Sequence, residues 1–271
     1  MSALVSPDWL QRQLDDPSMV VLEASVERAT YDGAHVPGAR WVDVHRDMLL
    51  GGDDLSGHPI AADDFAALMR RLGVSPESTV VWYGDRHSSL AIRGFWTMKF
   101  YRHRGAVHVL DGGRERWLDA GRPTTADVPS VNATRYPIPI GADESDRATI
   151  DQVRDAIRQP GSVILDVRSR DEYTGANRRA ARGGHIPDAA HVEWTDATDA
   201  PNALKSVSQL QAMYEAQGVT PDREVIAYCQ LGIRASHAWF VLKHVLGYPN
   251  VRNYDGSWQE WGNRDDTPIE A

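Results

Sequence analysis

The chain has 271 residues, of which 42% are hydrophobic and 25% are charged, and its formal net charge at pH 7 is -9. Because one domain typically has roughly 100 to 200 residues, this length predicts a globular protein of two domains. The acidic balance, without any block of Lys and Arg, argues against nucleic acid or anionic lipid as the main partner. No apolar run approaches the ~20 residues of a membrane span, and residues 1–14 lack the pattern of a secretion signal, so we expect a cytoplasmic protein that does not contact membranes.

The first half of the chain alternates between helical and strand patterns. Ser6 stands where a helix N-cap is expected, and the apolar run 20–22 ends at an acidic residue. The turn 35–39 reads His-Val-Pro-Gly-Ala, the amphipathic stretch 62–72 predicts a helix, and 80–83 is a second apolar run.

The second half repeats these features in the same order. Thr149 is the second N-cap, 163–165 is an apolar run ending at an acidic residue, and 185–189 reads His-Ile-Pro-Asp-Ala. The helical stretch 208–217 and the apolar run 225–228 follow. Single residues also correspond, in the same order in both halves: Tyr31, Asp111, Gly112 and Trp117 match Tyr173, Asp255, Gly256 and Trp261. We infer that the chain contains two tandem copies of one fold.

Between the copies, residues 124–147 are rich in Pro, Thr, Ala and Asp and lack periodicity, as expected of a linker. We therefore place an amino-terminal domain at 1–123 and a carboxyl-terminal domain at 148–271. Strands that alternate with helices predict an α/β fold, each domain a mainly parallel sheet flanked by helices. Such sheets carry their chemistry at the carboxyl ends of the strands.

The only cysteine, Cys229, lies at such an end. A single cysteine excludes an internal disulfide, a CxxC redox pair and any metal site built from several cysteines, and we expect no metal or organic cofactor. The buried-strand pattern 225–228 precedes it, and a helix is expected over 235–246. The residues between Cys229 and that helix form a short loop: Gln230, Leu231, Gly232, Ile233 and Arg234.

A loop of this kind can point its backbone N–H groups inward at the positive end of the helix dipole, which makes an anion cradle. We expect the thiol there to ionise readily, helped by Arg234. The alternatives are a buried inert thiol for Cys229 and a surface salt bridge for Arg234. A cysteine protease would need a base, and we expect His237 and His244 to project along the helix, away from the loop. His35 and His185 are interpreted as residues that stabilise their turns.

Taken together, these residues resemble the tandem-domain rhodaneses, the thiosulfate and mercaptopyruvate sulfurtransferases. The resemblance covers nearly the whole chain. It rests on the opening 5–10, the two His-(Val/Ile)-Pro-(Gly/Asp)-Ala turns, the segment 166–169 with Glu172 and Tyr173 after it, and the loop from Cys229 to Arg234.

The resemblance implies that Cys229 carries a persulfide, that Arg168 and Arg234 bind an anionic sulfur donor, and that the amino-terminal copy is catalytically silent. Gly84 and Asp85 stand at the place of Cys229 in that copy, and an acidic residue there would repel an anionic substrate. A thiol or cyanide would accept the sulfur.

The loop sequence departs from the best-known members. Thiosulfate enzymes of the family carry a basic residue directly after the cysteine, and mercaptopyruvate enzymes carry Gly-Ser-Gly-Val-Thr, whereas Gln230 follows here. The loop looks like a bacterial variant that begins Cys-Gln and ends in Arg. Thiosulfate is the favoured donor because an Arg fork can engage its sulfonate, and mercaptopyruvate is the alternative.

Two other functions compete with sulfur transfer. A phosphatase or arsenate reductase also uses a cysteine and an arginine around an anion cradle, but it has one residue more between them than the four found here. A non-catalytic rhodanese-like module that binds or regulates partners is the other alternative. The intact cysteine and the two arginines argue against it, and a turnover assay distinguishes the two.

Overall fold

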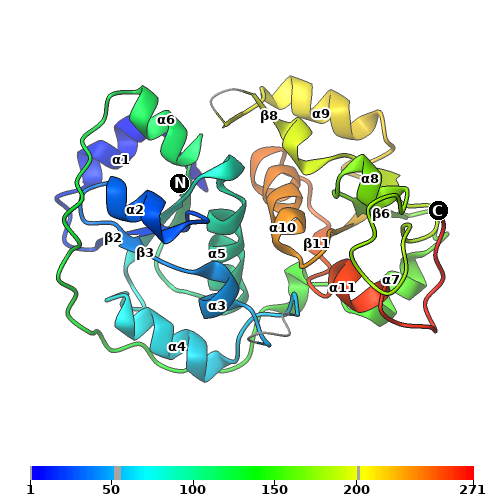
Figure 1. Ribbon diagram of the computed structural model, residues 1–271, viewed down its shortest axis with the longest axis horizontal. Coiled ribbons are helices and arrows are strands. Elements are labelled where there is room, and N and C mark those ends of the chain that lie inside the picture. Colours follow the sequence, from blue (N-terminus) through cyan, green and yellow to red (C-terminus); the bar gives the residue numbers. More distant parts are fainter. Residues whose placement is uncertain (1, 52–55, 200–201) are drawn as a thin grey trace. The chain divides into compact units, whose positions relative to one another are not determined.

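The computed structural model describes residues 2–51, 56–199 and 202–271, and the chain forms two compact units (Figure 1). Unit 1 consists of Met1–Leu49, Pro59–Asp143 and Thr198–Leu204. Unit 2 consists of Leu50–His58, Glu144–Ala197 and Lys205–Ala271. The expected linker is therefore divided, with its residues up to Asp143 in unit 1 and those from Glu144 onward in unit 2.

Within the described residues, unit 1 is built on a five-stranded sheet in the order β1-β5-β4-β2-β3, in which every neighbouring pair is parallel. Helices precede or follow each strand. The strands are β1 Leu4–Val5, β2 Met19–Glu23, β3 Arg40–Trp41, β4 Thr79–Tyr83 and β5 Val107–Leu110; the helices are α1 Pro7–Gln13, α2 Arg28–Gly33, α3 Val44–Met48, α4 Ala62–Arg71, α5 Ser89–Phe100 and α6 Gly113–Asp119.

The described part of unit 2 contains a four-stranded parallel sheet in the order β11-β10-β6-β7. The strands are β6 Ser162–Asp166, β7 Ala190–His191, β10 Glu224–Tyr228 and β11 Val251–Asn253; the helices are α7 Ile150–Ala156, α8 Arg170–Tyr173, α9 Val207–Glu215, α10 Ile233–Phe240 and α11 Ser257–Trp261. A short antiparallel pair, β8 Thr198–Asp199 and β9 Ala203–Leu204, belongs to unit 1. The predicted fold class, two tandem α/β copies with parallel sheets, is confirmed.

The duplication extends to individual contacts. Ser6 and Thr149 cap α1 and α7 through their side chains, as predicted. The two turn histidines also correspond: the ring of His35 stacks on Tyr31 with centroids 3.9 Å apart, and that of His185 stacks on Tyr173 at 3.7 Å. In both histidines Nδ1 hydrogen-bonds the carbonyl oxygen of that same tyrosine. These contacts agree with the predicted role of both histidines in holding their turns.

The core of unit 2 fixes the sheet edge that bears the cysteine. Tyr228 and Ile164 face the indole rings of α11 and the apolar side of α7 within one buried cluster. Strands β10 and β6 are in register, with Tyr228 opposite Asp166, and Val167 donates its N–H to the carbonyl oxygen of Tyr228. Cys229 and Val167 therefore leave the sheet side by side, at the carboxyl ends of two adjacent strands.

The helix after the cysteine loop differs from the prediction over 235–246. Helix α10 begins at Ile233 and ends at Phe240, and the chain continues as one π-helical turn, Val241–Val245. Gly232 caps the amino end in a left-handed conformation with φ of 70°, which costs glycine little because it has no Cβ. The loop between strand and helix is thus shorter than the sequence pattern predicted.

Candidate active site

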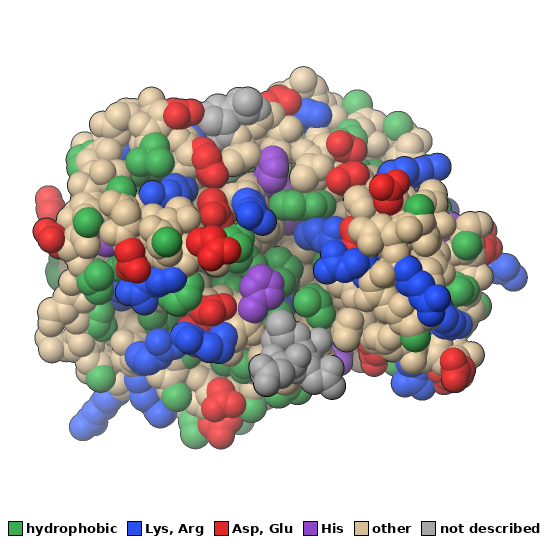
Figure 2. Space-filling view, viewed as in Figure 1, with side chains coloured by type: hydrophobic (Ala, Val, Ile, Leu, Met, Phe, Trp, Pro, Cys, Tyr) green, Lys and Arg blue, Asp and Glu red, His purple; other side chains and the backbone are tan. Residues whose placement is uncertain are grey.

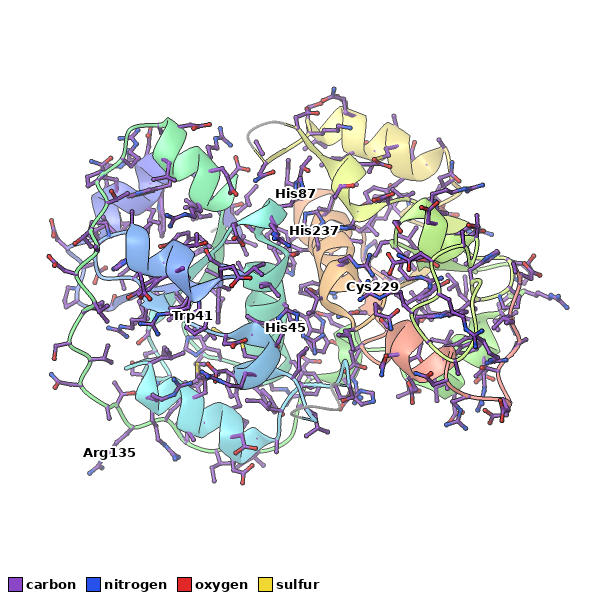
Figure 3. The ribbon with its side chains drawn as sticks, in the orientation of Figure 1. Trp41, His45, His87, Arg135, Cys229 and His237 are labelled. Carbon is purple, nitrogen blue, oxygen red and sulfur yellow. The ribbon has the colours of Figure 1, made fainter. Side chains whose placement is uncertain are left out.

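Cys229 follows the last residue of β10 and lies beside the amino end of α10 (Figure 3). The residue is 1% exposed. By helix geometry the N–H groups of the first turn, those of Ile233, Arg234 and Ala235, have no acceptor within the helix. The positive end of the helix dipole therefore lies next to the sulfur, as the sequence indicated.

Ser257, which the sequence analysis did not single out, holds the cysteine loop. Its hydroxyl accepts the backbone N–H groups of Cys229 and Gly232, each at 3.0 Å, and donates to the carbonyl oxygen of Tyr254 at 2.7 Å. Trp258 also donates its backbone N–H to the carbonyl oxygen of Cys229, at 2.9 Å. These two loop N–H groups are bound to the hydroxyl, so fewer N–H groups remain available to bind an anion.

The backbone of Ser257 has a φ of 51°, and the residue is fully buried. A left-handed conformation in a residue other than glycine costs about 1–3 kcal/mol and persists only where surrounding contacts impose it. The three hydrogen bonds of the hydroxyl supply that compensation. The sequence signal for this residue was present but unused: it directly follows Gly256 in the duplicated Asp-Gly pair.

Arg234 forms a fork-like ion pair with Glu172 of α8. Its Nη1 and Nη2 donate to the two carboxylate oxygens at 2.6 and 2.9 Å. Ser169 donates its N–H and its hydroxyl to the same carboxylate, each at 3.1 Å. Burial alone would raise the pKa of Glu172, but the hydrogen bond from Arg234 and the charges around it lower that pKa to about 2. The guanidinium therefore has a permanent anionic partner, and its side chain remains 21% exposed.

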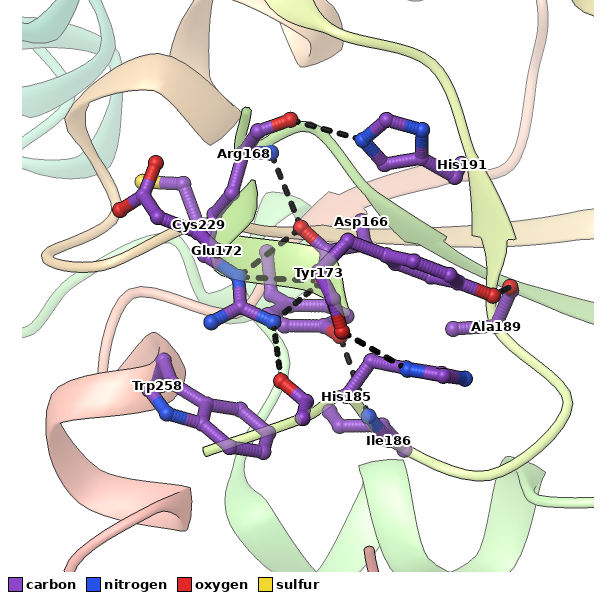
Figure 4. A network of polar contacts seen from close by, with 12 residues as sticks. Asp166, Arg168, Glu172, Tyr173, His185, Ile186, Ala189, His191, Cys229 and Trp258 are labelled. Carbon is purple, nitrogen blue, oxygen red and sulfur yellow. Dashed lines mark hydrogen bonds and ion pairs between the residues drawn. The ribbon is translucent and has the colours of Figure 1, made fainter. Parts of the chain in front are cut away.

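Arg168 is 1% exposed, and its guanidinium faces protein groups (Figure 4). Its Nε lies 3.0 Å from both oxygens of Asp166, and its Nη2 donates to Asp166 at 2.6 Å and to the carbonyl oxygen of Gly184 at 2.7 Å. The group also lies over the ring of Trp258, 4.4 Å from the centroid. The contact of Arg168 with substrate stays a prediction.

Tyr228 completes this buried network. Its hydroxyl donates to Asp166 at 2.5 Å and accepts the backbone N–H of Ile186 at 3.1 Å. Burial raises the pKa of Tyr228 well above its usual range, so the hydroxyl stays protonated and remains a donor. The network links Asp166, the last residue of β6, to Tyr228, the last residue of β10. Cys229 and its loop follow directly after Tyr228.

The rest of the loop is also held in place. Gln230 is 7% exposed, and its Nε2 donates to the carbonyl oxygen of Arg179 at 3.0 Å and to Oε1 of Gln259 at 3.1 Å. Leu231 is half-buried, and Ile233 is 8% exposed. The side-chain amide nitrogen of Gln230 is thus bound by protein groups.

A segment from the first half of the sequence reaches the cysteine loop within unit 2. A Cβ added at Gly57 would lie 2.9 Å from the backbone carbon of Leu231, so the chain passes close to the loop there. The next residue, His58, places its Nδ1 3.3 Å from Asp255, which Arg147 also binds at 2.9 Å. The hydrogen bond to Asp255 raises the pKa of His58, against the effect of burial. The contact between His58 and Asp255 has no local signal in the sequence, because 197 positions separate the two residues.

In the described part of unit 1, glycines stand at the positions of both Cys229 and Ser257 of unit 2. Gly84 follows β4, and Gly113, with φ of 54°, stands where unit 2 has Ser257. A Cβ at Gly113 would clash with the carbonyl oxygen of Gly84 and with the hydroxyl of Ser88. This place therefore cannot hold a serine without rearrangement.

The two histidines that follow the loop, His237 in α10 and His244 in the π-helical turn after it, are the residues from which a base for the thiol could come. His237 is 1% exposed, and its ring packs edge-on against Trp194 with centroids 5.7 Å apart. The ring of His244 lies against Trp239 and Phe240. Both rings are packed among aromatic side chains, in line with the expectation that neither serves the thiol.

Over the face drawn in Figure 2, Lys and Arg side chains of the described residues are interspersed with Asp and Glu side chains. Among the residues that the structure describes, no helix combines the length and the apolar character needed to cross a bilayer.

Comparison with known proteins gives consistent matches. Residues 6–120 and 149–264 each match the family described as "Rhodanese-like domain". The "Sulfur carrier protein TtuD" of Thermus thermophilus is 42% identical, over 98% of this chain and 95% of that protein. The "Thiosulfate sulfurtransferase" of Corynebacterium glutamicum is 37% identical, over 99% of this chain and 90% of that protein.

Solved structures also match both units of the chain. A structure of EanB with ergothioneine covalently linked to a cysteine persulfide superimposes with a TM-score of 0.87 at 25% identity. The match covers 99% of this chain and 70% of that chain. The fold of both units is thus found in a protein that carries sulfur on a cysteine.

Proposed function

The chain belongs to the rhodanese family and is a sulfurtransferase, and we propose that it moves the outer sulfur of thiosulfate to a thiophilic acceptor through a persulfide on Cys229. The observation that carries this proposal is the position of the only cysteine: it lies at a strand end, beside the first turn of α10 and next to the partly exposed Arg234. A thiolate is favoured by such a helix terminus and by a nearby guanidinium. The name of the relative from Corynebacterium supports thiosulfate as the donor.

In the first half-reaction the Cys229 thiolate attacks the outer sulfur of thiosulfate. A bond forms between the cysteine sulfur and that atom, the sulfur–sulfur bond of thiosulfate breaks, and its electron pair leaves with sulfite. The product is a persulfide whose terminal sulfur carries one negative charge. The helix dipole and Arg234 stabilise that charge as they stabilise the thiolate.

In the second half-reaction an acceptor attacks the terminal sulfur. With cyanide, a carbon–sulfur bond forms, the persulfide bond breaks, thiocyanate leaves and the thiolate returns. A thiol can take the same sulfur and become a persulfide itself. The chain contributes orientation and charge to both steps, with the loop fixed by Ser257 and the arginine fixed by Glu172.

The two arginines divide these tasks. Arg234 has an exposed edge and is the residue that we expect to contact the sulfonate oxygens of the donor. Arg168 is enclosed by Asp166 and Trp258. We propose that it supports the loop indirectly, because it holds Asp166, which binds the hydroxyl of Tyr228 directly before Cys229. Gln230, Leu231, Gly232 and Ile233 shape the cradle.

The test is the mass of one peptide. After incubation with thiosulfate, the peptide that contains Cys229 should gain the mass of one sulfur atom, and cyanide should remove it. Cys229→Ser should abolish turnover while keeping the fold, because a hydroxyl there does not ionise near neutral pH. A peptide that stays unmodified with both thiosulfate and mercaptopyruvate would contradict the persulfide and favour a non-catalytic module.

A further inference from the structure

A short segment from the first half of the sequence belongs to unit 2 and lies against the cysteine loop. Leu50 donates its N–H to the carbonyl oxygen of His58 at 2.8 Å, which holds the two ends of this segment together. Beside His58, an ideal Cβ at Gly57 would clash with the backbone of both Asp255 and Leu231. The segment therefore packs on two connections at once, the cysteine loop and the one between β11 and α11.

Asp255 lies in the second of these connections, and its carboxylate is bound from several sides. Its Oδ2 accepts a hydrogen bond from Nε of Arg147 at 2.9 Å, and its Oδ1 accepts the backbone N–H of Gly256 at 3.0 Å. The same Oδ1 lies 3.3 Å from Nδ1 of His58. Because the Asp255 side chain is only 1% exposed, protein groups rather than water set its orientation.

This carboxylate is connected to the residue that holds the cysteine loop. Gly256, whose N–H Asp255 accepts, directly precedes Ser257. The hydroxyl of Ser257 in turn accepts the backbone N–H groups of Cys229 and Gly232. The orientation of the Asp255 carboxylate therefore affects the backbone from which Ser257 holds the thiol.

The ring of His58 has a different partner in each protonation state. Its Nδ1 lies between the Asp255 carboxylate and Nη2 of Arg147, which is 3.1 Å away. A neutral ring accepts the hydrogen bond from Arg147 through the Nδ1 lone pair, and that lone pair then also faces a carboxylate oxygen. A protonated ring donates from Nδ1 to Asp255 instead. The uptake of a proton therefore exchanges a contact with Arg147 for a contact with Asp255.

In the described part of unit 1 the corresponding carboxylate is arranged differently. Asp111, the counterpart of Asp255, has a side chain that is 21% exposed, and it is bound by Arg116 of the helix that follows it. Gly113 stands in the place of Ser257. The contact between an imidazole and this carboxylate is thus found in the copy that has the thiol.

We propose that His58 is a positioning residue for sulfur transfer. As an imidazolium it holds Asp255, and through Ser257 it holds the cysteine loop in the conformation that presents the thiol. The kinetic consequence rests on the proposed function of Cys229, whereas the coupling between His58 and the loop does not depend on that function.

The charged groups around His58 favour its protonated form. The hydrogen bond to Asp255 and the charges of Asp255 and Glu260 raise the pKa of His58, and this effect exceeds the lowering by burial and by Arg147. Glu144 binds Arg147 at 3.3 Å and offsets part of its charge. Because the folded-state pKa lies above the ordinary value of 6.5, the contact with Asp255 is complete below pH 6.5 and is lost as the pH rises through the raised pKa.

The first test measures the coupling without turnover. It uses NMR spectra of the Cys229→Ser chain, in which position 229 does not titrate near neutral pH. The ring signal of His58 is the one that is absent when His58→Asn is added. The backbone amide signals of position 229 and of Gly232 should shift with the same midpoint as that ring. The shift should disappear with His58→Asn, which keeps a side-chain donor at the place of Nδ1 at every pH. Amide signals that do not respond at the His58 midpoint would overturn the proposal.

The second test compares kcat/KM for thiosulfate, with cyanide as acceptor, from about pH 6 to about pH 9. His58→Leu cannot bind Asp255 at any pH. Near pH 6 its kcat/KM should therefore be about tenfold below that of the unmodified chain, and this ratio should fall toward one as the pH rises. His58→Asn should recover most of the loss near pH 6, and its rate relative to the unmodified chain should rise with pH. A ratio of the unmodified chain to His58→Leu that is constant over this range would show a merely structural contribution and contradict the inference.

The two tests separate this inference from the proposed function. If thiosulfate is not turned over, the proposed function fails, and the amide titration alone decides whether His58 holds the loop. If urea unfolding shows that His58→Leu does not fold, His58→Asn carries the kinetic comparison. A rate of His58→Asn that stays in constant proportion to that of the unmodified chain at every pH would then count against the role of the imidazolium.

Discussion

The hydroxyl of Ser257 lies within hydrogen-bond distance of the backbone nitrogens of both Cys229 and Gly232, at 3.0 Å each. One side chain thus fixes both ends of the loop that carries the thiol. It does so from a backbone conformation that glycine would adopt without strain. The hydroxyl, and not the backbone conformation, is therefore what requires a serine at this position. Substitution by alanine and by glycine tests the effect of the hydroxyl and the effect of the backbone strain separately.

Ser257→Ala should lower both turnover and the free energy of unfolding. The substitution leaves two buried N–H groups without their acceptor, at about 1–3 kcal/mol for a buried unpaired group, and keeps the strained backbone. Ser257→Gly should lose turnover to a similar extent but less stability, because glycine tolerates the positive φ. Steady-state rates and urea unfolding of both variants check this. Turnover equal to that of the unmodified chain in either variant would refute the role of the hydroxyl.

The ion pair between Arg234 and Glu172 predicts a pH dependence of stability. The folded-state pKa of Glu172 is about 2, against an ordinary value of 4.5. A carboxyl group with a lowered folded-state pKa contributes stability that is complete above the ordinary value and is lost as the pH falls through the folded-state value. The contribution should therefore disappear between pH 4.5 and about 2.

Glu172→Gln isolates that contribution from the other carboxylates. Urea unfolding at pH 6 should show the variant to be less stable than the unmodified chain, and the difference should shrink as the pH approaches about 3. A difference that is constant over this range would mean that the charge of Glu172 does not contribute through Arg234.

Arg168→Ala distinguishes a supporting role from a substrate contact. Removal of the guanidinium leaves Asp166, which is 0% exposed, with a buried charge and no cationic partner. Breaking such a pair typically costs about 3–5 kcal/mol, so thermal unfolding should occur at a lower temperature. Arg170→Ala, an exposed arginine two positions on, is the matched control and should be close to neutral.

The kinetic measurement decides between the roles of Arg168. A support for the loop should lower kcat with thiosulfate and with mercaptopyruvate alike. A large rise in KM for thiosulfate, without loss of stability, would show instead that Arg168 binds the donor as the family resemblance implied.

The sequence predicted those features that depend on neighbouring residues. The caps at Ser6 and Thr149 and the parallel strands follow from local patterns. The pairing of Arg234 with Glu172 could not be predicted, because it depends on how the first turn of α10 and the helix α8, 62 residues apart in the sequence, are brought together. The same holds for Ser257, whose hydroxyl meets the loop only after β11 has paired with β10.

The π-helical turn after α10 is a second feature that the sequence did not predict. The residues 235–246 have an uninterrupted helical pattern, yet the hydrogen bonds change at Val241. Such a turn arises from packing within the unit and leaves no signature in periodicity.

Thiosulfate should be a better donor than mercaptopyruvate, measured as kcat/KM for each with cyanide as acceptor. Arg234 presents a partly exposed guanidinium at the end of the loop, and a sulfonate can bind it with charge-assisted hydrogen bonds. Mercaptopyruvate enzymes of the family have a small hydroxyl residue near the cysteine, whereas the amide of Gln230 is bound to Arg179 and Gln259. Leu231 and Ile233 offer only apolar contact.

Arg234→Ala should therefore reduce kcat/KM for thiosulfate by about 1.5–3 kcal/mol, the usual value of a hydrogen bond to a charged group. Arg234→Lys keeps the charge but loses the fork, so it should recover only part of that loss. Since Glu172 would lose its partner in the alanine variant, the double variant Arg234→Ala with Glu172→Gln separates the donor contact from the buried charge. If mercaptopyruvate gives the higher kcat/KM in the unmodified chain, the donor assignment must be reversed, while a persulfide on Cys229 would still hold for either donor.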